Sequence, residues 1–291
     1  MMMRIFGGVV CAVIVACGPT ARNHGNDASG GGSGNGNGSG SGSGSGGMDY
    51  KVYAHADHVL YSIDLATQQL VTIGPFHAPQ VMTGTSTSED VITDLGVAPD
   101  GTIYVISETA LYTASGQDGH VTQVGSLSTC GQKMVALTNT PDGKLYTGDY
   151  SGHICEIDIA TSPPSVKPPV TMSGGLALSG DMVAINSGKV FGTAYKLTDR
   201  SGQGTQANNL LVEVDLATGT TTTIGSSGFP KLFGAAFQMG KVFGFTHDQS
   251  GRVVTIDTTT GVGSVFGTFM DPATHKGISF AGAGVNALVI E

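Results

Sequence analysis

The sequence predicts an all-β fold built as a ring of repeated units, and this prediction rests on two recurring motifs and their spacing. In the first motif a polar residue is followed by an aliphatic residue and then an aromatic one. It occurs at residues 51–53, 102–104, 144–146, 189–191 and 241–243, so its copies begin 51, 42, 45 and 52 residues apart. A period of about 40–50 residues made of short strands is typical of a β-propeller.

The second motif is an aliphatic-rich strand that ends in Asp, and it is clearest at residues 60–64, 154–158, 211–215 and 253–257. Between the motifs, one repeat shows the expected plan of four strands, at residues 95–98, 102–107, 111–114 and 120–125. The turns Pro99-Asp100-Gly101 and Gln117-Asp118-Gly119 separate strands of this repeat, because Pro presets φ and Gly accepts a positive φ. We therefore expect four-stranded blades.

An Asp opens the outer turn of most repeats, and these residues are Asp64, Asp158, Asp215 and Asp257. An Asp in this place accepts hydrogen bonds from the backbone N–H groups of its own turn. Because one such residue recurs in most blades, we interpret them as structural residues and not as metal ligands.

The number of motif copies predicts five blades. The first copy has no innermost strand before it, and we expect residues 277–282 to supply one. One blade would then be closed by strands from both termini, which removes the exposed sheet edges. Residues 285–290 also resemble a strand, so a ring of six blades with one irregular blade is the alternative.

The N-terminal residues 1–16 have the features of an export signal. Arg4 precedes an apolar stretch at residues 5–16 that is too short to span a membrane. This stretch runs into Ile14-Val15-Ala16-Cys17, which resembles the bacterial lipobox and implies lipidation of Cys17; an ordinary secretory signal is the alternative. Residues 17–47, rich in Gly, Ser and Asn, are expected to form a disordered tether. Residues 48–291 are then expected to form the propeller.

These features predict a protein of the cell envelope that is held to a membrane by its lipid. It would face the periplasm or the exterior, and would lie at the outer membrane if the cell is Gram-negative. Residues 48–291 hold 11 Lys and Arg against 21 Asp and Glu, and this balance argues against nucleic acid as a partner. In an oxidising compartment, Cys130 and Cys155 are expected to form a disulfide within one blade; two free thiols are the alternative.

Binding residues are expected on one face of the ring. The turns on one face are short and stereotyped, whereas the loops on the other face are irregular, and variable loops on a rigid scaffold commonly carry function. His and carboxylate side chains gather in these irregular loops, and together they can bind Ca²⁺, Zn²⁺ or another divalent metal. The candidate metal ligands are His55, Asp57, His58, Asp149, His153, His247 and Asp248.

A second candidate site concerns the residue expected just before the innermost strand of each blade. This residue is Lys133, Lys231 or Lys276 in three blades and Asp94 in a fourth. Equivalent positions of a propeller form a ring around the central channel, so the lysines would form a basic collar that attracts a small anion or an acidic protein loop. Three independent surface lysines are the alternative.

The repeats are similar to those of bacterial secreted propellers of the NHL and lactonase-like groups. The lactonase-like resemblance implies Ca²⁺ in the channel, with Glu108, Asn139 and Asn186 as candidate ligands by residue type. The sequence lacks a G-x-S-x-G elbow, an H-E-x-x-H motif and a Gly-rich phosphate loop. We therefore expect a lipid-anchored module that binds a ligand or a protein, without catalysis and without a cofactor. A metal-dependent hydrolase or lactonase is the alternative.

Overall fold

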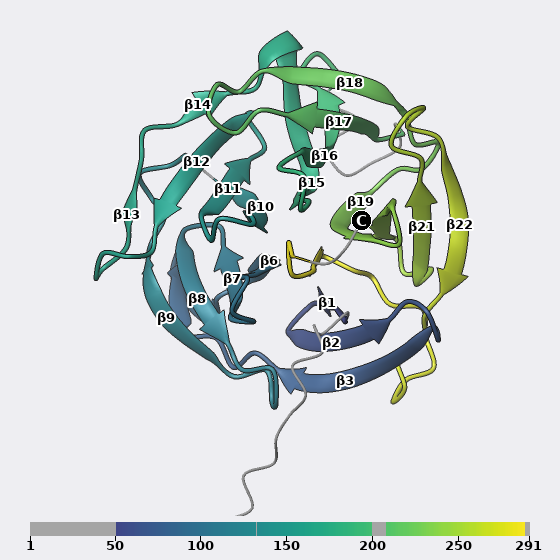
Figure 1. Ribbon diagram of the computed structural model, residues 1–291. Helices are drawn as coiled ribbons and strands as arrows, with labels where there is room; N and C mark the ends of the chain where they lie inside the picture. The colour runs from purple at the N-terminus through teal and green to yellow at the C-terminus, as the bar shows by residue number, and fades with distance from the viewer. Residues whose placement is uncertain (1–50, 132, 200–207, 289–291) are drawn as a thin grey trace, which may run out of the picture. The chain divides into compact units, whose positions relative to one another are not determined.

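The computed structural model describes residues 51–131, 133–199 and 208–288. Within these residues the fold is a β-propeller, with five antiparallel blades arranged around a central axis (Figure 1). This confirms the predicted fold class. The signal, the tether and Cys17 lie outside the described residues.

Each blade has its innermost strand at the axis and its outermost strand at the rim (Figure 1). Blade one contains β23 (Gly282–Gly284), β1 (Val52–Ala56), β2 (Val59–Asp64) and β3 (Gln69–Pro75). Blade two contains β6 (Ile92–Val97), β7 (Ile103–Ser107), β8 (Ala110–Ala114) and β9 (Val121–Ser126). Blade three contains β10 (Met134–Asn139), β11 (Leu145–Asp149), β12 (His153–Asp158), β13 (Ser165–Val166) and β14 (Val170–Thr171).

The remaining two blades follow the same plan. Blade four contains β15 (Leu176–Ala184), β16 (Val190–Lys196), β17 (Leu210–Val214) and β18 (Thr221–Ser226). Blade five contains β19 (Leu232–Gln238), β20 (Lys241–Thr246), β21 (Arg252–Ile256) and β22 (Gly263–Thr268). A separate hairpin of β4 (Gln80–Thr83) and β5 (Ser86–Glu89) lies between blades one and two in the sequence, where only an irregular loop was expected.

The ring is closed by strands from both ends of the propeller, as predicted. β23 pairs with β1 in antiparallel register, with Tyr53 opposite Gly284 and His55 opposite Gly282. The closing strand lies later in the sequence than the expected 277–282. Beyond it, Asn286 forms an isolated bridge with Val97. The described part of residues 285–290 is thus not a strand of a further blade, and the ring has five blades.

Neighbouring blades contact each other at the rim through a repeated device that the motifs did not reveal. The end of each outermost strand lies against the outer turn of the next blade. A Cβ added at Gly74 or Gly225 would overlap a backbone carbonyl of that turn, from Asp118 and Thr260 respectively. Glycine at this position therefore permits the close approach of two backbones.

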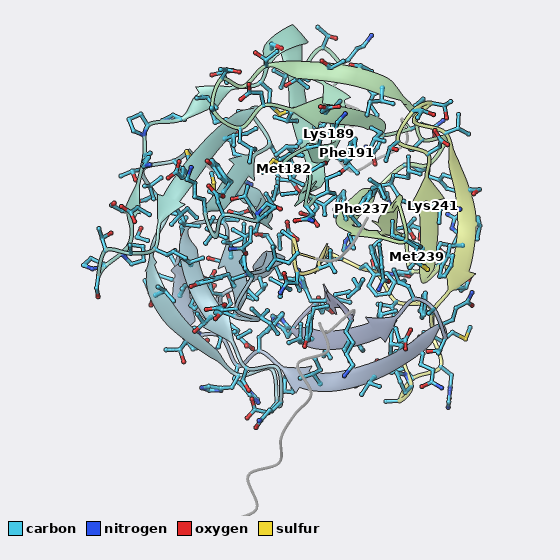
Figure 2. The ribbon with its side chains drawn as sticks, viewed as in Figure 1. Met182, Lys189, Phe191, Phe237, Met239 and Lys241 are labelled. Atoms are coloured by element: carbon cyan, nitrogen blue, oxygen red, sulfur yellow. A yellow bond between two sulfur atoms is a disulfide. The ribbon has the colours of Figure 1, made fainter. Side chains whose placement is uncertain are left out.

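Apolar side chains fill the spaces between the blades. Between blades four and five, for example, the rings of Phe191 and Phe237 stack with their centroids 6.4 Å apart (Figure 2). Within blade three, Cys130 and Cys155 form the predicted disulfide, whose Cα atoms are 5.8 Å apart.

The outer-turn aspartates have the predicted structural role. The Oδ1 atom of Asp257 accepts hydrogen bonds from the backbone N–H groups of Thr259 and Thr260, at 2.9 and 2.8 Å. The hydrogen bonds from the hydroxyl of Thr259 and from these backbone groups lower the pKa of Asp257 to about 2. Asp64 and Asp215 accept the same two backbone hydrogen bonds, so the recurring Asp is part of a turn motif.

Candidate functional site

On the irregular-loop face, a groove lies between blades one and five. It is lined by segments 56–61, 247–249 and 270–279, and we call it the interblade groove. Its volume is about 860 Å³, which lies within the range of small-molecule sites. The groove therefore lies among the irregular loops.

Polar side chains from both blades meet in the interblade groove. The hydroxyl of Tyr61 donates a hydrogen bond of 2.9 Å to Asp271 Oδ2. Asp271 also accepts bonds from the backbone N–H groups of Ala273 and Thr274. The bond from the Thr274 N–H, followed by that from Tyr61, lowers the pKa of Asp271. Asp271 is thus held as an anion at the groove wall.

A second, smaller hollow lies where the central axis opens on the same face. This axial pocket has a volume of about 130 Å³ and receives residues from all five blades. Its lining includes Thr93, Val135, Tyr150, Gly180, Phe233, His247 and Ala281.

Irregularities in the innermost strands produce this pocket. The antiparallel register shifts between Ile92 and Asp94, between Met134 and Ala136, and between Leu232 and Gly234. The skipped residues, Thr93, Val135 and Phe233, all belong to the lining of the pocket. A β-bulge re-aims side chains in this way, so three bulges at the same level direct their side chains toward the axis.

Directly beyond Thr93 and Gly180 in their strands lie two buried carboxyl groups, those of Asp94 and Asp181. Asp94 Oδ2 accepts a hydrogen bond from Leu137 N at 2.7 Å, and Asp181 Oδ2 accepts one from Ala235 N at 2.6 Å. Each carboxylate therefore connects its blade to the next one. Burial raises the pKa of both groups well above the usual range, and for Asp94 the charge of Asp181 adds to this effect. The two groups therefore share a proton.

His55 of β1 lies beside this pair and is fully buried. A Cβ added at Gly282 would lie 2.7 Å from His55 Nε2 and would overlap Asp94 Oδ1, so both atoms converge over this glycine. Hydrogen bonds with the backbone of Thr93 and Asp57 favour the protonated ring, but burial outweighs them. Burial lowers the pKa of His55 to about 4, so the ring is neutral at pH 7. We call Asp94, Asp181 and His55 the axial cluster.

His247 joins the two hollows, because it lines both the interblade groove and the axial pocket. Its ring stacks on Phe233 with the centroids 4.8 Å apart and an interplanar angle of 12°. Its Nδ1 atom lies 3.0 Å from the carbonyl oxygen of Phe280, which fixes the orientation of the ring. His247 is therefore part of the wall of both the groove and the pocket.

The structure gives the four predicted collar residues different places. Lys133 and Lys231 directly precede innermost strands and share a left-handed backbone, with φ of 64° and 56°. Lys133 pairs with Glu108 at 3.7 Å. Lys276 is exposed in the interblade groove, well before β23. Asp94 lies inside β6, because this strand begins at Ile92 and not at the expected residue 95. The four residues are therefore not equivalent positions of one ring.

The predicted metal ligands are also distributed over several places. His153 Nδ1 lies 2.9 Å from Asp149 Oδ2, whose other oxygen accepts the backbone N–H groups of Ser151 and His153. Asp57 lies in the interblade groove. Within the described residues, no three His, Cys, Asp or Glu side chains form a group that could hold a metal ion.

Two further candidates from this set have partners elsewhere. His58 Nδ1 lies 4.0 Å from Glu89 Oε2 of the β4–β5 hairpin. Asp248 pairs with Arg252. Burial alone would raise the pKa of Asp248, but hydrogen bonds from Ser250, Arg252 and Thr246 hold it far below the usual range.

Among the residues that the lactonase-like resemblance suggested, Asn139 is buried near the axis, where a Cβ at Gly96 would lie 3.1 Å from its Oδ1. Asn186 is exposed on the opposite face, in a groove of about 840 Å³ between blades three and four. Glu108 is exposed beside Lys133. The structure does not bring these three residues together.

Sequence reasoning missed Asp181, Tyr61 and Phe233. A signal for Asp181 was present, because it is the single charged residue in the strand Leu176–Ala184, as Asp94 is in Ile92–Val97. Two lone carboxylates in innermost strands of one ring must approach the same axis. No comparable signal marked Tyr61 or Phe233, because aromatic residues also fill the core of such strands.

The fold and site define a propeller with an axial pocket and a side groove on its loop face. The sequence matches the family described as "Repeat of unknown function (DUF6923)" over residues 96–269, and the chain belongs to this family. No curated protein matches the sequence.

Solved structures with a similar chain path include a protein of unknown function from Bacteroides caccae. It is 13% identical, with 75% of this chain and 72% of that chain covered and a TM-score of 0.42. Another is the protein described as "putative TolB" from Agrobacterium tumefaciens, with 14% identity, 79% of each chain covered and a TM-score of 0.45.

Proposed function

We propose that this protein is a binding module of the cell envelope that takes a small ligand, or one side chain of a protein ligand, in the interblade groove and the axial pocket. The observation that carries this proposal is that His247 lines both a groove of about 860 Å³ and a pocket to which all five blades contribute. A rigid ring that presents a concave site with a few convergent polar groups is a common form of ligand site.

The position at the membrane is part of the same proposal. The lipobox-like residues 14–17 and the Gly/Ser-rich residues 17–47 support a lipid anchor followed by a flexible tether. A tether of about thirty flexible residues has an average reach of roughly 30 Å. The propeller would therefore sample ligands within a few nanometres of the membrane surface. Within the described residues there is no helix long and apolar enough to cross a membrane.

The proposal is tested by blocking the groove and measuring ligand binding. A panel of small amines, carboxylates and neutral hydroxyl compounds is added to the purified protein, and binding is detected by NMR signals of the compounds. Thr274 is exposed in the interblade groove, and Thr274→Trp should occlude it without disturbing buried residues. We expect this substitution to abolish most of the binding.

The matched control is Thr218→Trp, because Thr218 is exposed in the groove on the opposite face. This variant should bind the panel as the parent protein does. Equal loss of binding in both variants, or no binding of any compound by the parent protein, would contradict the proposed site.

A further inference from the structure

We propose that the axial pocket takes the uncharged alkyl end of a small ligand, so that the ligand of the proposed binding module carries an aliphatic group of about four carbons. This inference rests on the proposed function and names the chemistry of one part of its ligand. Three features of the pocket carry it: the residues that line it, the rigidity of its wall and its volume.

The lining of the pocket is mainly apolar. It includes the aliphatic residues Ile92, Val135 and Ala281 and the aromatic residue Phe233. Val91 also belongs to the lining, and its side chain is 58% exposed. An alkyl group that enters such a pocket leaves water, and this transfer is the main favourable contribution to the binding of apolar groups.

The polar side chains of the lining do not offer a partner for an ion. The hydroxyl of Thr93 donates a hydrogen bond of 2.8 Å to the carbonyl oxygen of Met134. The Nδ1 atom of His247 lies 3.0 Å from the carbonyl oxygen of Phe280. Burial raises the pKa of Tyr150 to about 12, so its hydroxyl is uncharged at pH 7.

Charged residues are absent from the lining as far as the described residues show, because it contains no Asp, Glu, Lys or Arg. An ammonium or carboxylate group in the pocket would lose its hydration without gaining an ion pair. Such a loss is costly in a buried place, so the pocket favours an uncharged group.

The two buried carboxyl groups near the axis do not change this preference. Asp94 and Asp181 are fully buried and are not part of the pocket lining. They are hydrogen-bonded to each other, and they also accept bonds from Leu137 N and Ala235 N. Their hydrogen bonds hold together the innermost strands whose neighbouring residues line the pocket.

The wall of the pocket is fixed by backbone contacts. A Cβ added at Gly180 would overlap the backbone of Phe233, so blades four and five meet through their backbones beside the pocket. The ring of Phe233 in turn stacks on His247, with the centroids 4.8 Å apart. A wall that is ordered before binding loses little conformational freedom when the ligand enters.

The volume of the pocket limits the alkyl group that it holds. About 130 Å³ corresponds to roughly four water molecules at about 30 Å³ each. Water in an apolar pocket finds few hydrogen-bonding partners, and its displacement by an alkyl group therefore favours binding. The polar part of the ligand would remain outside the pocket.

The first test uses three probes of similar size: n-butanol, n-butylammonium and butyrate. Each is titrated into the purified protein while the backbone amide signals of Thr93, Gly180 and Ala281 are followed by NMR. We expect n-butanol to shift these signals in a saturable manner and both ions to bind about tenfold more weakly or less. Binding of either ion as tightly as n-butanol, or no shift of these amides with n-butanol, would overturn the inference.

The length of the alkyl chain provides a second test. From ethanol through n-propanol to n-butanol, affinity should rise about fourfold for each added CH₂ group, as expected when each group leaves water. The gain should become smaller beyond n-butanol, because further carbons extend out of the pocket. An affinity that does not rise from ethanol to n-butanol would contradict an alkyl site.

A substitution in the lining should reverse the preference between the neutral probe and the cation. Val91 is exposed and directly precedes β6, so Val91→Asp adds a carboxylate to the lining without changing a core residue. It should weaken n-butanol and strengthen n-butylammonium, so that the ratio of their affinities falls about tenfold.

The matched control is Val262→Asp, because Val262 is 61% exposed and directly precedes the outermost strand β22 of blade five. This variant should change the ratio of the two affinities less than about twofold, since an exposed charge at the rim is screened by solvent. An unchanged ratio in Val91→Asp, or an equal change in both variants, would contradict the assigned pocket.

The two proposals fail in different ways. If the compound panel binds and Thr274→Trp abolishes that binding while n-butanol leaves the pocket amides unshifted, only the alkyl subsite is wrong. If n-butanol shifts these amides and Thr274→Trp leaves the binding of the panel unchanged, the proposed groove is wrong.

Discussion

Asp94 is the residue in which the difference between sequence and structure is clearest. From the sequence we expected Asp94 at the mouth of the central channel. In the structure its side chain is fully buried and accepts a hydrogen bond from the next blade. The difference arises because β6 begins at Ile92 and not at residue 95, so Asp94 lies inside the strand. The turn aspartates were predictable because their partners lie within three residues, and the partners of Asp94 lie in other blades.

The raised pKa of Asp94 predicts a stability effect with a definite sign. Between its unfolded pKa, near 4, and its raised folded pKa, the folded protein holds a proton that the unfolded chain has lost. Stability is therefore lost as the pH rises through this window. In Asp94→Asn this pH-dependent loss of stability should be absent, because the amide NH₂ can donate a hydrogen bond to Asp181 in place of the shared proton. The free energy of unfolding of the variant, relative to the parent, should increase from pH 4 to pH 7 in urea titrations. A difference that stays constant or shrinks would show that the proton is not shared.

His55 predicts a pH dependence of the opposite sign over an overlapping pH range. Its folded pKa of about 4 is lower than the ordinary value of 6.5, so the unfolded chain binds the proton first as the pH falls. The contribution of His55 to stability should therefore fall from pH 6.5 to pH 4, by on the order of 1 kcal/mol per pH unit. His55→Leu should remove this slope, whereas His120→Leu, at an exposed histidine, should retain it. Equal slopes in both variants, measured by urea unfolding, would contradict the buried neutral state of His55.

At the scale of strands and turns, most of the architecture was predictable. The number of copies of the strand motif predicted the number of blades, and the turn residues predicted the division of blade two into four strands. The bulges in β6, β10 and β19 were not predictable, because an extra residue in a strand changes neither the apolar pattern nor the turn signals. Since the bulges form the axial pocket, the site itself could not be located from the sequence.

The rim glycines provide a test of how neighbouring blades are joined. A Cβ at Gly225 would overlap the backbone carbonyl of Thr260, which cannot move without displacing its turn. Gly225→Ala should therefore lower the free energy of unfolding by about 1–3 kcal/mol. At the corresponding place in blade five, a Cβ at Gly267 would lie 3.3 Å from the flexible side chain of Gln68. Gly267→Ala is the matched control and should cost much less. Equal effects of the two substitutions on thermal unfolding would show that the rim contacts do not hold the blades.

At the scale of the whole molecule, the anchor and the ring are separate predictions. The closed ring follows from the repeat and from the pairing of β23 with β1. The anchor rests on residues 14–17 and stays a prediction. The chemistry of the propeller's ligand could not be predicted from net charge alone. Net charge describes the whole surface, whereas the candidate site depends on which carboxylates are buried.

Lipid anchoring should depend on Cys17. Cys17→Ser removes the thiol to be acylated, and acyl chains contribute about 0.8 kcal/mol of membrane binding for each buried CH₂ group. The variant should stay in the aqueous phase or remain unprocessed when cells are extracted with a phase-separating detergent, while the propeller keeps its fold. If the variant entered the detergent phase as the parent does, with residues 1–16 removed, the anchor would lie elsewhere.

The most direct test of the central claim is a crystallographic screen with the same amines, carboxylates and hydroxyl compounds. The account predicts that bound compounds occupy the interblade groove and contact His247. Compounds found only in the opposite groove, at Thr218 and Glu213, or only at scattered surface positions, would contradict it.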